Sequence, residues 1–335
     1  MKNTEINYNN QVFLFDLIQK ALPANIALVD VIADKLDISV DAAYRRMRGD
    51  KPISFEEAIK LCQSFQISMD SFVNITRKNQ TQCNYTPLNL SDLSEYATYI
   101  QVLAANIERL RMTPESEIIM SASDIPLFNF FEHNELTLFK LFSWNKNTYG
   151  ITGSYEEFVS KLDTNELLKY WGEIVEDYKL IPSTEIWTAN TIDVFLRLLS
   201  YHYETGDFKD EKNILLLCNQ LMDLINNLQD WAEKGTKGSK GAPLKLFISD
   251  TDLESTFLLL KQPEKTSCRV KLFTINSLTT FDERFCQEVE NWLLSSAQRA
   301  TLISGASAKA RYIFLNNQKQ KIRFLIEKIQ LDSGK

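Results

Sequence analysis

Apolar side chains recur at every third or fourth position along most of this chain, which is the spacing of one face of an α-helix. The first clear case covers residues 28–36. A second helix is predicted over residues 40–48. Ser39 before it can accept a backbone N–H of the first turn, and Gly49 after it suits a left-handed C-terminal cap. The apolar positions of the first helix are Leu28, Val29, Ile32, Ala33 and Leu36.

Three more helices are predicted around this pair. One precedes it over residues 12–22. The next one follows it and starts with Ser54 and Glu57, which have the three-residue spacing of a capping box. A further helix begins near residue 67. This succession of short helices predicts an all-α domain over residues 1–77.

The segment resembles the helix-turn-helix of the lambda-repressor/Cro class of bacterial regulators. The resemblance covers about the first quarter of the chain, and two departures from it matter. Asp37 stands where the turn usually carries glycine, and Asp tolerates left-handed backbone better than most residues do. Arg46 stands where the family often has an apolar residue, which predicts a looser or rotated end of the second helix. The matching segments are residues 32–36, 38–39, 48–52 and 61–70.

The resemblance implies that residues 40–48 are a recognition helix that enters the major groove of double-stranded DNA. It also implies that Arg45 and Arg48 reach bases or phosphates, and that Lys51 reaches a phosphate. The residues implied to lie nearest the bases are Ser39, Val40, Asp41 and Tyr44. One alternative stays open, in which Arg45, Arg46 and Arg48 only form a solvated helix face.

A polar linker is expected at residues 78–90, followed by a larger α+β domain over residues 91–335. This domain begins with a long helix over residues 91–112, whose apolar positions repeat every seven residues in two columns. Three such heptads are the lower limit for a coiled coil. The pattern leaves two options, a seam that pairs two chains or a helix packed on its own domain. The two columns are Leu93, Ile100 and Ile107, and Tyr96, Leu103 and Leu110.

The rest of the larger domain is expected to be helical around a few strands. Residues 117–123 could form a short strand, and a Lys- and Gly-rich loop is expected at residues 234–243. The fold class predicted is mostly α with a small antiparallel sheet. Its three neighbouring strands are residues 244–249, 256–261 and 269–275. The later helices are predicted at residues 155–162, 164–178, 186–205, 210–232, 281–296 and 308–329.

Composition describes an ordinary globular protein of 335 residues, with 44% hydrophobic and 24% charged residues. The net charge of -7 argues against strong non-specific affinity for nucleic acid, although a local basic patch covers residues 45–51. The 5 cysteines are scattered, which predicts buried thiols in a reducing compartment. The sequence has no signal peptide and no membrane-spanning run, so a cytoplasmic protein without a membrane partner is expected.

No catalytic or metal-binding motif emerges from the sequence. The 2 histidines, His133 and His202, have no metal-ligand spacing with Cys, Asp or Glu. Asp250 and Asp252 are explained most simply as residues of a turn. The sequence therefore predicts a protein that is not an enzyme and needs no cofactor or metal.

These observations favour a DNA-binding transcriptional regulator. Its partners would be double-stranded DNA, a second copy of the chain in a homodimer, and an unidentified small-molecule effector sensed by the larger domain. The pairing surfaces would be the heptad seam and the closing helix with Leu315, Ile322, Leu325 and Ile329. Two alternatives stay open, a module whose N-terminal domain docks a partner protein and an enzyme with an autoregulatory helix-turn-helix.

Overall fold

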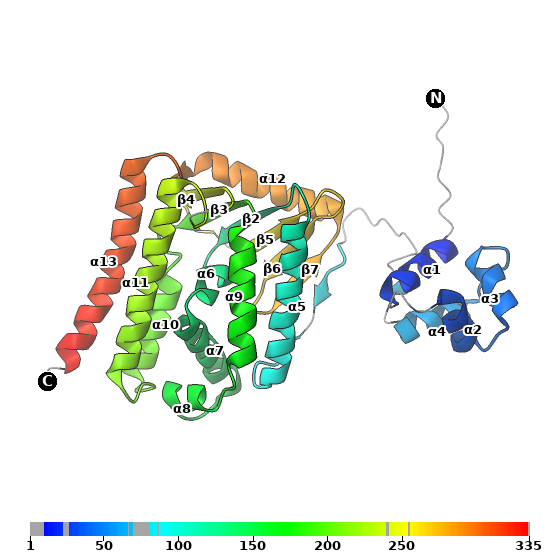
Figure 1. The fold of residues 1–335 in the computed structure, drawn as a ribbon, viewed down its shortest axis with the longest axis horizontal. Coiled ribbons are helices and arrows are strands. Elements are labelled where there is room, and N and C mark those ends of the chain that lie inside the picture. Colours follow the sequence, from blue (N-terminus) through cyan, green and yellow to red (C-terminus); the bar gives the residue numbers. More distant parts are fainter. Residues whose placement is uncertain are drawn as a thin grey trace. The chain divides into compact units, whose positions relative to one another are not determined.

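The chain divides into two compact units, Met1–Gln80 and Thr81–Lys335, in a computed structural model (Figure 1). No helix among the residues that the structure describes is long and apolar enough to cross a membrane. The described residues are 10–22, 27–65, 67–69, 81–85, 87–238, 241–253 and 255–333.

The first unit is helical throughout its described part. Its helices are α1 (Asn10–Ala21), α2 (Leu28–Leu36), α3 (Val40–Met47) and α4 (Phe55–Phe65). They pack around a core in which α1 contributes Leu14, Phe15 and Ile18, and α2 contributes all five of its predicted apolar positions. The predicted fifth helix lies mostly outside the described residues, which include only 67–69 of it.

The helix ends of this unit follow from the predicted capping residues. Asp37 closes α2 in the left-handed region at φ 54°, and Gly49 follows α3 at φ 80°. The hydroxyl of Ser39 accepts the backbone N–H of Ala42 at 3.2 Å and so begins α3. The capping box at the start of α4 is also present, with both of its hydrogen bonds formed. The turn residue Asp37 therefore does what glycine would do here.

The second unit is built on an eight-stranded mixed sheet with strand order β1-β7-β6-β5-β2-β3-β4-β8. Strands β2, β3 and β4 are parallel neighbours, and the other pairs are antiparallel. The strands are β1 (Asn84–Tyr85), β2 (Glu117–Ala122), β3 (Ser183–Thr188), β4 (Leu244–Ser249), β5 (Phe257–Lys261), β6 (Ser267–Lys271), β7 (Ser277–Thr280) and β8 (Thr301–Leu302).

Helices cover both faces of this sheet, unequally. Helix α12 (Glu283–Arg299) lies over one face (Figure 1), and Ile119 and Ile186 belong to the core between that face and α12. Their neighbours Ile118 and Trp187 point to the opposite face, where a much larger core lies under the remaining helices. Those helices are α5 (Leu93–Met112), α6 (Leu127–Phe131), α7 (Asn134–Tyr149), α8 (Tyr155–Ser160), α9 (Asn165–Lys179), α10 (Asp193–Glu204), α11 (Glu211–Lys234) and α13 (Ala308–Ser333).

The expectation of a small antiparallel sheet was wrong. Strand β4 pairs in parallel with β3, and two strands separate it from β5. The helix predicted over residues 186–205 was wrong in its first part, because Ser183–Thr188 is strand β3 and α10 begins only at Asp193. All six residues of β3 are buried. A strand covered on both faces has no alternation of apolar and polar positions, so it escapes a search for period two.

Both helices expected to pair two chains instead pack within the second unit. Five of the six seam positions of α5 are buried in the large core, and only Leu93 is half-buried. The inward positions of α13, among them Leu315 and Ile322, are buried in the same core, where α13 packs on α11. The option of a helix packed on its own domain is therefore the correct one for the α5 seam.

The end of the predicted linker belongs to the sheet. Asn84 and Tyr85 form the edge strand β1, which pairs antiparallel with β7. Thr280 fixes the same segment by donating its hydroxyl to the carbonyl of Gln82 at 2.6 Å. The chain therefore enters the second unit directly through its outermost strand.

Candidate functional site

The residues expected to contact DNA share one exposed surface. All seven are exposed, whereas Ala43 on the other side of α3 is fully buried in the core. The guanidinium carbon of Arg48 lies 5.9 Å from the centre of the Tyr44 ring, a cation–π contact that orders both side chains. The seven residues are Ser39, Val40, Asp41, Tyr44, Arg45, Arg48 and Lys51.

Arg46 differs from its basic neighbours, since it is buried and serves the fold. Its Nη2 and Nε donate to the two carboxylate oxygens of Glu57 at 2.8 and 3.2 Å, and its Nη1 donates to the carbonyl of Ala42 at 3.2 Å. Burial alone would raise the pKa of Glu57, but the hydrogen bond from Arg46 helps to hold it below its usual value. The expectation of a looser end of α3 was wrong, because this bidentate pair ties α3 to α4.

A second residue that sequence reasoning missed, Gln11 of α1, braces the segment after α3. Its amide nitrogen donates to the carbonyls of Arg46 at 2.7 Å and Lys51 at 2.8 Å, and its amide oxygen accepts from the backbone of Ile53 at 2.9 Å. No local pattern identifies a polar residue that acts forty positions away. Together with the Arg46 pair, it fixes the backbone that carries Arg48 and Lys51.

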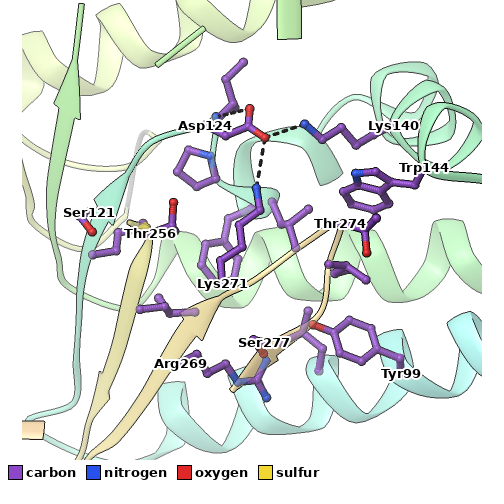
Figure 2. A pocket seen from close by; sticks show the side chains of 18 residues that line it. Tyr99, Ser121, Asp124, Lys140, Trp144, Thr256, Arg269, Lys271, Thr274 and Ser277 are labelled. Atoms are coloured by element: carbon purple, nitrogen blue, oxygen red, sulfur yellow. Dashed lines mark hydrogen bonds and ion pairs between the residues drawn. The ribbon is translucent and has the colours of Figure 1, made fainter. Parts of the chain in front are cut away.

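The second unit contains a cavity of about 110 Å³ beside the carboxyl end of β2 (Figure 2). Side chains of β2, β5, β6, β7, α5, α6 and α7 line it, and most of the lining residues are apolar or aromatic. In open sheets, ligands bind outside the carboxyl ends of parallel strands. The cavity lies at such an end, on the side where β2 meets its antiparallel neighbour β5.

A cluster of charges occupies one side of this cavity (Figure 2). Asp124 Oδ2 lies 2.6 Å from the Nζ of Lys140 and 3.2 Å from the Nζ of Lys271, and Oδ1 accepts from the backbone of Ile125 at 2.9 Å. Burial by itself would raise the pKa of Asp124, but the two ammonium charges lower it below its usual value. The carboxylate is therefore ionised and shared by two cations.

Arg269 adds a third cation to the cavity wall. Burial raises the pKa of Tyr99, which lines the same cavity, and the charge of Arg269 opposes this shift. No ion pair joins Arg269 to a carboxylate among the residues that the structure describes. The cavity therefore presents one half-buried cation that no anion of the described chain neutralises.

Ser143, His202 and Asp207 form a buried triad that no sequence motif marks. The hydroxyl of Ser143 lies 2.9 Å from Nε2 of His202, and Nδ1 of His202 lies 2.8 Å from Oδ2 of Asp207. This is the connectivity of a serine hydrolase. Ser143 and His202 have no exposed surface, however, and the rings of Phe139 and Phe142 pack on the imidazole. A substrate cannot reach the Ser143 hydroxyl in this conformation, so the triad is best explained as a buried polar network.

Lys237 lies in the segment predicted as a loop, but it is fully buried. Its Nζ has no hydrogen-bond partner among the residues that the structure describes, and it lies 3.7 Å from the centre of the Tyr178 ring. Burial lowers the pKa of Lys237 to about 7, while the nearby charge of Glu185 opposes the shift. The Lys- and Gly-rich loop expected at residues 234–243 therefore includes one lysine whose side chain is buried in the second unit.

Comparison with known protein families, curated proteins and solved structures finds no match to this chain. Within the described ranges, no group of three or more His, Cys, Asp or Glu residues could hold a metal ion. Of the five cysteines, Cys83 is exposed, contrary to the expectation, and the other four are buried.

Proposed function

We propose that this chain is a DNA-binding transcriptional regulator whose helix α3 enters the major groove. The observation that carries the proposal is that all seven residues implied to contact DNA are exposed and lie at the start of α3, on it or just after it. A major groove accepts one helix, whose N-terminal residues then reach the base edges. Two interactions that hold the end of α3 support this role, the hydrogen bond from Gln11 to the carbonyl of Lys51 and the ion pair of Arg46 with Glu57. Recognition needs a rigid helix end.

The second unit would carry regulation. Its cavity is lined partly by β6 and β7, and β7 pairs with β1, where the chain enters from the first unit. Asn276, in the turn before β7, also holds the backbone N–H of Leu88 at 3.0 Å. A ligand that shifts this turn or β7 therefore acts on the segment that follows the first unit. This route needs two states of the edge strand that the ligand binds with different affinity.

The test starts with selection of bound sites from random DNA duplexes. The double variant Arg45→Ala/Arg48→Ala should then bind a selected site at least about 30-fold more weakly at matched salt, since it loses two contacts of about 1–3 kcal/mol each. The control is Arg299→Ala/Arg323→Ala, which removes the same charge from exposed positions of the second unit. Equal affinity of the two double variants would overturn the proposal.

A second candidate function, docking of a partner protein, is favoured by one observation. Val40 and Tyr44 of α3 are each 46% exposed, and Phe55 of α4 is 65% exposed. Large exposed apolar side chains mark protein contacts more often than DNA contacts. Failure of the full chain to enrich any duplex in the selection would favour this candidate over DNA binding.

A homodimer stays part of the proposal, because regulators of this class gain specificity by pairing two half-sites. Since α5 and α13 use their expected pairing positions inside their own unit, the pairing surface would have to lie elsewhere. Sedimentation at micromolar concentration, with and without DNA, measures the mass directly. A monomer under both conditions would contradict the dimer and leave the DNA-binding test unaffected.

A further inference from the structure

We propose that the cavity beside β2 binds a small monocarboxylic acid with an apolar body. The carboxylate would pair with Arg269, Lys271 at the Asp124 side of the cavity would add positive charge, and the body would lie among the apolar and aromatic side chains of the cavity. The assignment rests on the geometry of the second unit alone. Only its regulatory meaning rests on the proposed function.

The charged side chains that line the cavity favour an anionic ligand. Four charged side chains line the cavity, namely three cations and the single carboxylate of Asp124, which leaves an excess of two positive charges. Lys140 lies closest to Asp124 and is buried among the rings of Phe130, Phe195 and Trp144, so these two groups satisfy each other. The excess is therefore carried by Lys271 and Arg269. An uncompensated cation beside a low-dielectric wall attracts an anion strongly.

Of these two cations, Arg269 is the one free to bind a carboxylate, because Lys271 already lies beside Asp124. Arg269 and Lys271 are alternate residues of β6, so their side chains leave the same face of the sheet. Both line the cavity, and both are half-buried, which leaves donor groups accessible from the cavity. Arginine offers a planar fork that binds carboxylate in bidentate fashion, and lysine adds a point charge.

Size and lining select the rest of the ligand. A dry apolar cavity of about 150 Å³ accommodates benzene, and this cavity of about 110 Å³ is of similar size and is not fully enclosed. Its walls include Trp144, Phe128, Leu103 and Met120. A benzoate or a short branched or linear fatty acid matches this combination. A dicarboxylate or a phosphate ester would bring a second charge into the apolar part at a desolvation cost.

The first experiment uses the full chain without any variant. Titration calorimetry compares benzoate, phenylacetate and hexanoate with their uncharged counterparts, benzyl alcohol, phenylethanol and hexanol. At least one acid should bind, and its alcohol should bind at least about tenfold more weakly, because the charge-assisted contact is lost. Inorganic phosphate should not compete with the bound acid.

The second experiment removes the cation. Arg269→Gln should weaken binding of the same acid about tenfold or more, and Arg269→Lys should restore part of it. The matched control is Arg299→Gln, an exposed arginine at the end of α12, which should leave the affinity unchanged. Circular dichroism and melting show that each variant is folded before binding is measured.

Three results would each overturn the proposal. The first is that no acid binds the unmodified chain at about 10 mM, a concentration at which even weak carboxylate sites are occupied. The second is that acid and alcohol bind alike, or that phosphate competes, since the site would then not recognise a carboxylate on an apolar body. The third is that a folded Arg269→Gln variant binds as well as the unmodified chain. None of these results bears on the selection of DNA sites, so the two proposals fail separately.

Discussion

Each unit of this protein buries a cluster of charges, and the two clusters differ in balance. In the first unit Arg46 faces Glu57, one cation against one anion, and every nitrogen of the guanidinium donates a hydrogen bond. In the second unit Asp124 faces Lys140 and Lys271, and Arg269 lines the same cavity without an ion pair among the described residues. A balanced cluster needs nothing further to be stable, so its role is structural. An unbalanced cluster beside a cavity suits a site that an external anion completes.

The largest loss in free energy of unfolding is expected from Asp124→Asn. This change keeps the shape of the side chain but leaves the buried ammonium of Lys140 without a counter-charge. Breaking a buried pair in this way costs about 3–5 kcal/mol. Denaturant unfolding followed by tryptophan fluorescence measures it, since all 5 tryptophans of the chain lie in the second unit. A loss below about 1 kcal/mol would mean that the cluster is not a structural anchor at all.

A smaller loss in free energy of unfolding, about 2–3 kcal/mol, is expected from Glu57→Gln in the first unit. The amide keeps one acceptor for Arg46 but removes the charge and weakens the capping box of α4. Hydrogen exchange of the amides in α3 and α4 reports the change, while tryptophan fluorescence should not respond. The control is Glu56→Gln, an exposed neighbour in the same first turn. If both variants exchange alike, the pair does not hold α3.

The comparison also explains how far the sequence alone could predict this molecule. The helices of the first unit, Asp37 in its turn and both caps follow from local chemistry, and all were predictable. The partner of Arg46 was not, because Glu57 was assigned only to its cap and nothing local pairs the two side chains. In the second unit, helices such as α5 were predictable from their period.

The cavity of the second unit was not predictable, and the reason is physical. Its charged residues come from segments up to 147 positions apart, such as Asp124 and Lys271. They meet only because β6, β5 and β2 are consecutive in the sheet. Strand β2 also pairs in parallel with β3, and β3 pairs in parallel with β4. The fully buried β3 carries no periodic signal that would show this.

Lys237 is a third buried cation, and no carboxylate among the described residues forms an ion pair with it. Its Nζ lies on the ring of Tyr178, with the charge of Glu185 nearby. Its pKa is lowered to about 7 in the folded chain from 10.5. Between these values the unfolded chain binds the extra proton, so stability rises with pH and levels off below 7. Lys237→Met should remove this rise, which amounts to about 1 kcal/mol from pH 7.5 to 8.5.

The measurement is the difference in unfolding free energy between Lys237→Met and the unmodified chain at each pH. Groups such as Cys218 and Cys268, whose pKa values burial raises to about 12, also affect stability in alkaline solution. They are present in both proteins, so they cancel in the difference. A difference that stays constant from pH 7 to 9 would show that Lys237 titrates as an ordinary exposed lysine.

The smallest effect on stability, less than about 1 kcal/mol, is expected from Lys271→Met, and it separates the two kinds of cluster most sharply. Lys271 is partly exposed, with 35% of its side chain accessible, and its removal leaves Asp124 paired with Lys140. An exposed ion pair of this kind contributes little. Lys245→Met, at an exposed position of β4, is the matched control. Tryptophan-detected unfolding should place the two variants within about 0.5 kcal/mol of each other, the range typical of surface substitutions.

If Lys271→Met instead destabilised the chain as much as Asp124→Asn, both lysines would be structural partners of one carboxylate. The second cluster would then be a scaffold like the first, and the charge left to recognise a ligand would be that of Arg269 alone.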